Sequence, residues 1–398
     1  MIDIGRHPIW KGSPIWGQIT PIKKRGHLLR IFLAKQYTKL LPKDLFVGVT
    51  GTVGKTTTVA ASLAVLSEKF KAISTSSDLD PVLNIPITIL KIRPNIKKVI
   101  LEMGIEYPQD MDFYLSLVHP SIGIITGVSL QHSEFLGGVE EIAKEKALLI
   151  EQLPIKGFAI LNYDDPIVRK MADKTKAQVI FFGSDPKNCH IWAGNIKIEN
   201  FQTVFELNYG VERIQIHSKL LGIHQIYPLL AAAALGISQE IQLTSIKRAL
   251  EKIESPTHRM QIHSGYNGSL IIDDTYNAAP ISVEEAINTL NILPARRRVV
   301  ILGEMRELGQ YSEKMHRSIA QKIYNDKIDL VFLLGGDTKY IQDELQKQGF
   351  IPERLQTFVN NSQIVNQVLK MLAKGDVVLV KGARANKLDE VVSRISKK

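Results

Sequence analysis

Short apolar segments alternate along the chain with longer segments whose apolar residues recur at helical spacing. The apolar segments are rich in β-branched residues and are bounded by glycine or polar residues, at 45–50, 97–104, 121–128, 157–165, 177–183, 297–305, 329–336 and 376–382. Strands that are apolar throughout are typical of parallel sheets covered by helices on both faces. The pattern therefore predicts an α/β protein, and at 398 residues the chain is long enough for more than one domain.

A domain boundary is predicted near residue 255, where a helical pattern stops at Ser255 and Pro256 and a strand-like segment follows. We expect a central domain at 46–255 with a mostly parallel sheet and a C-terminal, Rossmann-like α/β domain at 256–398. Residues 197–218 alternate between apolar and polar positions, which predicts an antiparallel hairpin appended to the first of these domains.

A basic arm at 1–45 precedes the first domain. Residues 1–44 contain nine basic and two acidic residues, which gives +7 of the total net charge of +10. Because the remainder is nearly balanced, we expect no nucleic-acid partner. Within the arm, residues 27–41 predict a helix whose apolar stripe is Leu29, Phe32, Leu33, Tyr37, Leu40 and Leu41. Two interpretations stay open: a helix docked on the following domain, or a helix lying on an anionic membrane surface.

Composition points to a cytoplasmic protein. The single cysteine, Cys189, excludes an intramolecular disulfide and a cysteine-based zinc site, and the first residues lack the apolar core of a signal peptide. The most apolar stretch, at 227–237, is shorter than the roughly 18 to 20 residues that cross a bilayer.

A glycine loop at 47–58 carries the first candidate chemistry. The usual phosphate-loop spacing needs glycine at 49, but this chain has Val49 and places its glycines at 48, 51 and 54. The loop follows a predicted strand and opens a predicted helix, which is the context a phosphate site requires. We expect Lys55 to neutralise phosphate and Thr56 to bind Mg²⁺. The nucleotide-binding residues predicted here are Gly51, Thr52, Gly54, Lys55, Thr56 and Thr57. A plain turn and a dinucleotide loop are the alternatives, and the Lys-Thr pair speaks against the dinucleotide loop.

Carboxylate and imidazole groups follow the neighbouring strands. Glu102 ends the predicted strand at 97–104, at the edge where open α/β sheets bind ligands, and is a candidate Mg²⁺ ligand. His132 follows another strand, and a helix beginning near Gly138 contains Lys144 and Lys146, which we expect to point in different directions.

In order and spacing, eight segments resemble the Mur ligase family, and the resemblance covers residues 46–395. The segments are GVTGTVGKTTT, LEMG, LQHSEFLGGVEEIAKEKA, ILNYDDP, HRM, IIDDTYNAAP, GEMRELGQYSEKMHRSIA and VLVKGARANKLDEVV. The family's ATP loop has the form G-x-x-G-x-x-G-K-T, so Val49 is no departure from it. Among family members, the chain is most similar to those that add D-alanyl-D-alanine.

The resemblance implies an ATP-dependent amide ligase of peptidoglycan precursor synthesis that acts on small-molecule substrates. A substrate carboxylate would attack the γ-phosphate of ATP, and an amine would then attack the resulting acyl phosphate. Two Mg²⁺ ions are implied. Lys55 and Thr56 would serve the phosphates and the first ion. Glu102 would be a metal ligand, joined by His132 around the second ion, which Lys146 carrying a carbamate would also hold.

In the C-terminal domain, the resemblance places Arg259 at the ATP phosphates and Asp274, Tyr276 and Asn277 beside the nucleotide. Because these residues lie beyond the boundary, closure of the two domains would complete the site. Lys381 and Arg384 would belong to the pocket for the incoming amine, with a solvated loop as the alternative.

Three departures from the family pattern bear on the substrate. Only about 45 residues precede the ATP loop, so we expect the UDP of a precursor to be held differently, by a protein partner or by the basic arm. Gln225 and Pro228 stand where the family has asparagines that contact adenine. His258 and Ala279 replace a glycine and an asparagine common in the family. The alternatives are an amide ligase for another acceptor, such as a glutamate chain on a folate-like molecule, and a catalytically weakened nucleotide-binding subunit.

Overall fold

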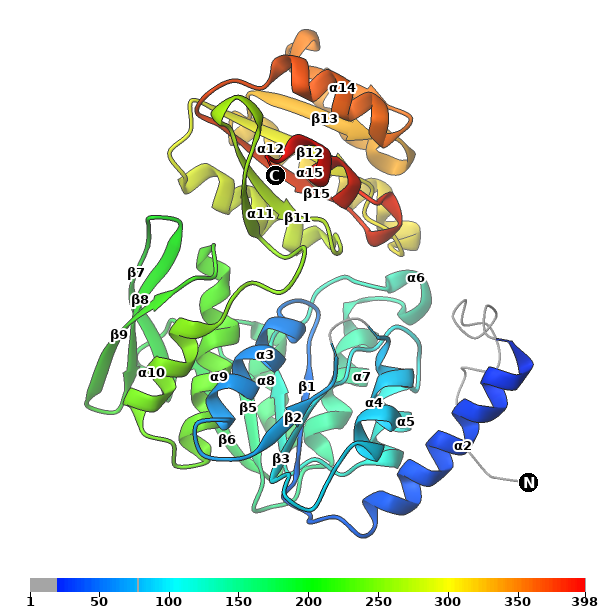
Figure 1. The fold of residues 1–398 in the computed structure, drawn as a ribbon, viewed down its shortest axis with the longest axis vertical. Helices are drawn as coiled ribbons and strands as arrows, with labels where there is room; N and C mark the ends of the chain where they lie inside the picture. The colour runs from blue at the N-terminus through cyan, green and yellow to red at the C-terminus, as the bar shows by residue number, and fades with distance from the viewer. Residues whose placement is uncertain (1–19, 77–78, 398) are drawn as a thin grey trace.

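Two β-sheets organise the chain, each in its own α/β unit (Figure 1). The computed structural model describes residues 20–76 and 79–397. The part of the predicted basic arm at 1–19 lies outside the described residues. The chain passes from the first unit to the second between residues 253 and 260, close to Pro256.

The first sheet has the strand order β2-β3-β1-β4-β5-β6-β7-β8-β9. Its strands are β1 (Phe46–Thr50), β2 (Ala72–Ser74), β3 (Lys98–Glu102), β4 (Ile122–Ile125), β5 (Phe158–Asn162), β6 (Gln178–Gly183), β7 (Ile191–Glu199), β8 (Gln202–Tyr209) and β9 (Glu212–Ser218). The pairs from β2 to β7 are parallel, whereas β7, β8 and β9 pair antiparallel. The predicted hairpin is therefore part of a three-stranded extension of the same sheet.

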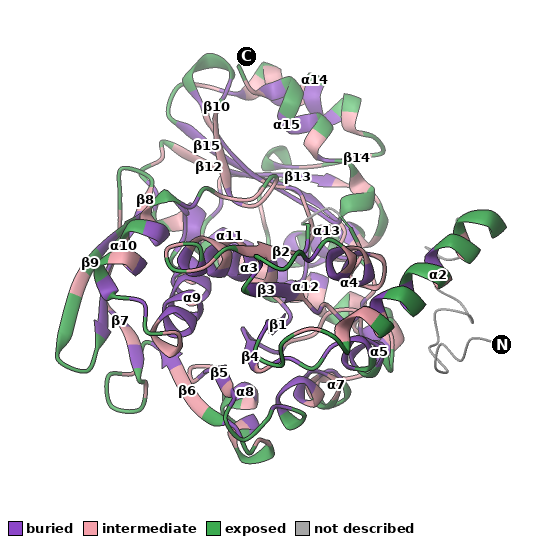
Figure 2. Ribbon diagram, turned by 60° about the horizontal axis from the view of Figure 1, so that its bottom comes forward, coloured by how far each residue is buried: buried purple, intermediate pink, exposed green. Residues whose placement is uncertain are grey.

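Helices cover both faces of this sheet (Figure 1). One core layer involves α4 (Pro81–Leu90), α5 (Asp110–Leu117) and α7 (Val139–Glu151), and the other involves α3 (Lys55–Leu66), α9 (Ile226–Ser238) and α10 (Leu243–Lys252). The short helices α6 (Ser133–Leu136) and α8 (Pro166–Lys170) complete the unit. Every residue of β1 and β4 is buried, as expected for parallel strands inside two helical layers (Figure 2).

The second sheet has the order β10-β11-β15-β12-β13-β14, with only the β10–β11 pair antiparallel. Its strands are β10 (Gln261–Ser264), β11 (Leu270–Asp274), β12 (Arg297–Gly303), β13 (Leu330–Leu334), β14 (Leu355–Phe358) and β15 (Asp376–Lys381). Helices α11 (Pro280–Ile292), α12 (Ser312–Asn325) and α13 (Lys339–Lys347) pack on one face, and α14 (Asn361–Met371) and α15 (Asp389–Ile395) pack on the other.

The strand order fixes where a ligand can bind. Strand β1 lies between β3 and β4, and all three are parallel. The loops that follow these three strands therefore start side by side at one edge of the sheet. In open α/β sheets, ligands bind at the carboxyl ends of the strands where the chain switches direction. The glycine loop, Glu102 and the segment after β4 all start from this edge.

Helix α2 (Pro21–Thr38) lies along the outside of the first unit and contacts α4 and α5 (Figure 1). It docks through His27, Ile31 and Ala34, which are buried. The helix is therefore docked on the first unit, but not through the predicted apolar stripe. Four residues of that stripe, Leu29, Phe32, Leu33 and Leu40, are exposed. Within the described residues, no helix has the length and apolar character needed to cross a membrane.

Candidate functional site

The glycine loop occupies residues 51–54, between the end of β1 and the start of α3. Gly54 caps α3 with φ +79°, a left-handed conformation that favours glycine. Gly51 also has a positive φ, and a Cβ added there would come within 1.9 Å of the Thr126 hydroxyl. Thr52 anchors the loop because its backbone N–H donates to Gly127 O over 2.8 Å. The loop is thus built for close backbone approach at the N-terminus of a helix, where phosphate binds readily.

Lys55 and Thr56 occupy the first turn of α3. The Lys55 ammonium donates to Thr52 O over 3.1 Å, and the Thr56 hydroxyl donates to the Glu102 carboxylate at the end of β3 over 3.0 Å. Burial lowers the pKa of Lys55, the charge of Glu102 opposes this shift, and Arg259 adds to it. Thr57, the next residue predicted to bind nucleotide, is buried in the same turn. The predicted loop residues and Glu102 therefore lie together.

Lys146 reaches this loop from α7. Its ammonium is buried and donates to Gly51 O over 2.9 Å. Burial lowers the pKa of Lys146 well below its ordinary value, and the nearby charge of Lys55 lowers it further. Lys144, two residues earlier, is exposed. The two lysines do point in different directions, as predicted, and only Lys146 lies against the glycine loop.

Arg259 brings the second unit to the same place. Its guanidinium Nη2 donates to the Thr56 hydroxyl over 3.0 Å, and the guanidinium carbon lies 4.0 Å from the centre of the Tyr276 ring. The residues just before Arg259 are held by His258, whose Nδ1 lies 2.8 Å from the Asp273 carboxylate. A cation from the second unit therefore faces the hydroxyl that Glu102 contacts from the first.

Asp274 and Lys381 end two neighbouring strands of the second sheet. Strands β11 and β15 pair in parallel with Asp274 opposite Lys381, and their side chains form a buried ion pair. Lys381 also donates to Asn277 O over 2.9 Å, and Met260 N–H donates to Asp274 over 3.2 Å. Lys381 is therefore a strand residue and not part of a solvated loop. Arg384 differs, since its side chain is exposed and pairs with Asp389 over 3.4 Å.

His132 lies at the contact between the two units. Its Nδ1 pairs with the Glu307 carboxylate, which lowers the pKa of Glu307. Beside this pair, the Ser133 hydroxyl donates to Leu308 O over 3.1 Å, and Glu134 N–H donates to Glu307 O over 3.0 Å. These hydrogen bonds join α6 of the first unit to the segment that follows β12 in the second.

A third side chain, Glu106, completes this cluster. Ligand atoms of Glu106, His132 and Glu307 all lie within 4.8 Å of one another, an arrangement that can hold a metal ion. No role was predicted for Glu106 or Glu307 from the sequence. The signals were present: Glu307 lies inside GEMRELG, and Glu106 follows Glu102 beyond the same strand.

The segment that contains Gln225 and Pro228, the two residues that stand in place of family asparagines, contacts the glycine loop through Pro228. Pro228 on α9 packs against the glycine loop, since its Cγ would lie 3.3 Å from a Cβ at Gly54. The Gln225 amide lies 3.1 Å from Nε2 of His224. Burial lowers the pKa of His224 to about 4, so its imidazole is neutral near pH 7. Pro228 thus borders the glycine loop, and the contact of Gln225 is with His224.

Comparisons with known proteins agree with this geometry. Residues 49–236 match the Mur ligase middle domain, and residues 258–384 match the domain described as "Mur ligase, glutamate ligase domain". The UDP-N-acetylmuramoyl-tripeptide–D-alanyl-D-alanine ligase of Buchnera aphidicola is 30% identical over 353 residues, which is 88% of this chain and 75% of the relative. The enzyme of the same name from Bacillus subtilis is 29% identical over 361 residues, or 90% of this chain and 77% of the relative.

Solved structures share the fold. MurF from Acinetobacter baumannii superposes with a TM-score of 0.85 at 21% identity, covering 94% of this chain and 81% of that structure. MurF from Thermotoga maritima, in complex with ADP, superposes with a TM-score of 0.81 at 22% identity. The superposition covers 92% of this chain and 82% of that structure. The mostly parallel central sheet and the separate C-terminal α/β sheet are therefore shared features.

Proposed function

The chain belongs to the Mur ligase family, and from that premise we propose that it joins D-alanyl-D-alanine to UDP-N-acetylmuramoyl-tripeptide while ATP is converted to ADP and phosphate. The substrate assignment is carried by the match along 88% of the chain to a ligase of that name. The reaction type is supported by the site, where a glycine loop, a threonine–glutamate pair and an arginine from the second unit converge.

Mg²⁺ fits the residues at the end of β3. The Thr56 hydroxyl and the Glu102 carboxylate are 3.0 Å apart, and hydroxyl and carboxylate oxygens are ligands that Mg²⁺ prefers. A second ion fits the cluster of Glu106, His132 and Glu307, whose ligand atoms are already close. Bound there, Mg²⁺ neutralises phosphate charge and orients the oxygens of the triphosphate.

The protein's own part in the reaction is positioning and charge neutralisation. The tripeptide carboxylate attacks the γ-phosphorus of ATP, the bond to the ADP oxygen breaks, and an acyl phosphate forms. The D-alanyl-D-alanine amine then attacks the acyl carbon, phosphate leaves, and the amine loses a proton. Lys55 and the backbone N–H groups of the glycine loop hold the phosphates, and Arg259 supplies a cation from the second unit.

We propose that Lys146 carries a carbamate. The modification adds CO₂ to a neutral amine and releases a proton, and burial next to Lys55 favours the neutral amine. The carbamate is an anion, and in this place it would face the glycine loop through the contact that Lys146 makes with Gly51 O. Its role would be to hold a cation and to keep Lys55 oriented.

Contacts between the two units support a closed arrangement during the reaction. Arg259 to Thr56, Ser133 to Leu308 and Glu134 to Glu307 are hydrogen bonds across the boundary. An acyl phosphate hydrolyses in water, so an arrangement that brings both units around it protects the intermediate. We propose that Asp274 and Lys381 keep the second unit's strand ends in register for this contact, and that Tyr276 and Asn277 border the nucleotide.

Phosphate release tests the proposal. The purified chain is incubated with Mg-ATP, D-alanyl-D-alanine and UDP-N-acetylmuramoyl-tripeptide, and each substrate is omitted in turn. Release that needs both substrates, with a product heavier than the tripeptide by one dipeptide less water, is the expected result. Release in the absence of amine would identify an ATPase, and no release with either substrate would assign the chain to another acceptor.

The partners of the enzyme are its small-molecule substrates. Two contacts stay predictions: one of the basic arm with an anionic membrane surface, and one with a protein partner that replaces the UDP-binding domain.

A further inference from the structure

Helix α2 has two apolar faces, and only one of them touches the body. His27, Ile31 and Ala34 recur at intervals of four and three residues, so they share one face of the helix, and all three are buried. This face packs on α4 and α5 (Figure 1). The remaining surface of the helix is exposed over most of its length (Figure 2).

The exposed face carries an apolar stripe. At about 100° per residue, Ile22, Leu29 and Leu33 point within roughly 20° of one direction, nearly opposite the buried face. Leu40, just beyond the helix, continues the same stripe. These four side chains are 83%, 52%, 45% and 81% exposed, respectively, and Phe32 beside them is 37% exposed. Such a row of leucine and isoleucine side chains on one helix face marks an interaction surface.

Basic residues flank this stripe on both sides. On the same helical wheel, Lys23 and Arg30 lie about 80° to 100° to one side, and Arg25 and Lys39 lie about 60° to 100° to the other. All four are exposed, and residues 21–39 contain no aspartate or glutamate. An apolar row between two rows of cations is the pattern of a helix that lies in the interface of an anionic bilayer.

We propose that α2 docks the enzyme on an anionic phospholipid bilayer, with Ile22, Leu29, Leu33 and Leu40 in the interface and the flanking cations on lipid phosphates. A second copy of the chain fits this surface less well. A two-fold dimer would place the same patch against itself, and the four cations that flank the stripe on each copy (Lys23, Arg25, Arg30 and Lys39) would repel their counterparts.

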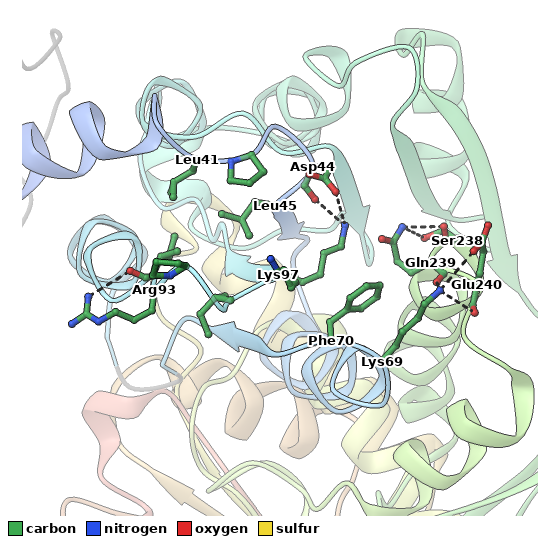
Figure 3. Close-up of a pocket in the computed structure, with 15 residues that line it drawn as sticks. Leu41, Asp44, Leu45, Lys69, Phe70, Arg93, Lys97, Ser238, Gln239 and Glu240 are labelled. Atoms are coloured by element: carbon green, nitrogen blue, oxygen red, sulfur yellow. Dashed lines mark hydrogen bonds and ion pairs between the residues drawn. The ribbon is translucent and has the colours of Figure 1, made fainter.

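The surface next to the end of α2 is also basic. A cavity of about 730 Å³ begins at Leu41 and Pro42, directly after the helix (Figure 3). Its exposed cations are Lys69, Arg93 and Lys97, of which Lys69 pairs with Glu240 over 3.7 Å. Beneath them, the buried Lys98 pairs with Asp44 over 3.5 Å. The cavity extends the positive charge of α2 onto the body of the first unit.

This surface lies away from the nucleotide loop. The cavity is lined by Lys98, the first residue of β3, and by Leu45, directly before β1, so it lies where these strands begin. The glycine loop and Glu102 lie where the same strands end. Docking through α2 and this edge therefore leaves the carboxyl edge free for substrates. The inference rests on the geometry of α2 and holds whichever acceptor the ligase uses.

Flotation with lipid vesicles tests the proposal with the full chain. Phosphatidylcholine vesicles containing phosphatidylglycerol are compared with vesicles of phosphatidylcholine alone. We expect the protein to float with the anionic vesicles only. High salt should release it, because salt screens the attraction between the cations and the lipid phosphates. Leu29→Glu/Leu33→Glu should lower the bound fraction at least about tenfold, because it removes apolar area and places acid in the stripe.

Val211→Glu is the matched control, since Val211 is 97% exposed on the turn between β8 and β9 and lies outside α2. It should bind vesicles like the unchanged chain, and both variants should keep the unfolding temperature and the rate of phosphate release in solution. Equal flotation of the unchanged chain and Leu29→Glu/Leu33→Glu would overturn the proposal, as would equal binding to both vesicle types or no binding. Self-association abolished by Leu29→Glu/Leu33→Glu, without vesicle binding, would assign the stripe to a second copy instead.

Discussion

The guanidinium of Arg259 donates a hydrogen bond to the hydroxyl of Thr56 over 3.0 Å, and the two residues lie 203 positions apart. Thr56 belongs to the first turn of α3 in the first unit, whereas Arg259 lies two residues before the start of β10 in the second. The same hydroxyl donates to Glu102. One threonine therefore joins the phosphate loop, a carboxylate that can hold Mg²⁺ and a cation delivered by the other unit.

Replacing Arg259 with lysine should slow the reaction while leaving the fold intact. Lysine keeps the charge but loses the planar group that lies over Tyr276 and the reach to Thr56. Loss of one donor to developing charge typically lowers kcat by about 10² to 10³. Phosphate release measures the effect, and Arg394→Lys on the exposed side of α15 is the control. A rate for Arg259→Lys within about twofold of the unchanged chain would contradict the assigned role.

Lys146→Ala should abolish amide formation, with at least about a hundredfold loss, because it removes the group proposed to carry an anion beside the glycine loop. Partial rescue by acetate or propionate would return a carboxylate to the vacated space. Lys144→Ala is the matched control, since that side chain is exposed on the same helix. Full activity of Lys146→Ala would refute the role, and loss without rescue by any carboxylate would argue against a carbamate.

The ion pair between Asp274 and Lys381 predicts a strong coupling in stability. The two side chains are 13% and 2% exposed, so removing one partner leaves a nearly buried charge. Asp274→Asn and Lys381→Met should each lower the free energy of unfolding by about 3 to 5 kcal/mol. The double variant should recover a large part of the loss. Denaturant unfolding of all four proteins measures the coupling, and additive losses would show that the pair does not act as a unit.

His224 predicts a loss of stability in acid. Burial lowers its pKa in the folded protein to about 4, below the ordinary value of 6.5 expected on unfolding. Its contribution is complete above about pH 6.5 and is lost as the pH falls towards 4, because only the unfolded chain takes up the proton. The free energy of unfolding should fall by about 1 to 3 kcal/mol over this pH range.

Thermal unfolding between pH 7 and 4.5 tests this dependence. The slope of the unfolding temperature against pH should be shallower for His224→Asn than for the unchanged chain. His119→Asn, which removes an exposed histidine from the same unit, serves as the control. Identical slopes for His224→Asn and the unchanged chain would show that His224 does not govern the loss of stability in acid.

Much of the fold could be predicted from the sequence because parallel strands buried on both faces are apolar throughout. All eight apolar segments contain strands of the two sheets. Strands β2 and β14 were missed, since they are short and only partly buried. The segment at 197–218 was assigned as a hairpin, and its third strand was missed because β7 begins six residues before the alternating pattern.

Side-chain contacts between distant segments were harder to predict. Periodicity identified the helix of the arm but selected the wrong face as the docking face, because α2 has apolar residues on two opposite sides and the sequence alone does not say which one meets α4. The pairing of His132 with Glu307 joins residues 175 positions apart across two units, and no local pattern reports such a contact. In contrast, Lys55, Thr56 and Glu102 lie where β1 and β3 end. Because these strands are neighbours in a parallel sheet, the closeness of the three residues could be predicted.

The central claim is that the tripeptide carboxylate attacks the γ-phosphorus of ATP, and the path of one carboxylate oxygen tests it most directly. UDP-N-acetylmuramoyl-tripeptide labelled with ¹⁸O in the reacting carboxylate is incubated with Mg-ATP, D-alanyl-D-alanine and the purified chain, and the released phosphate is analysed by mass spectrometry. Attack of the carboxylate on the γ-phosphorus, followed by attack of the amine on the acyl carbon, predicts phosphate carrying one ¹⁸O atom. Phosphate released without the label would mean that water, and not the tripeptide carboxylate, attacks ATP, and would contradict the account.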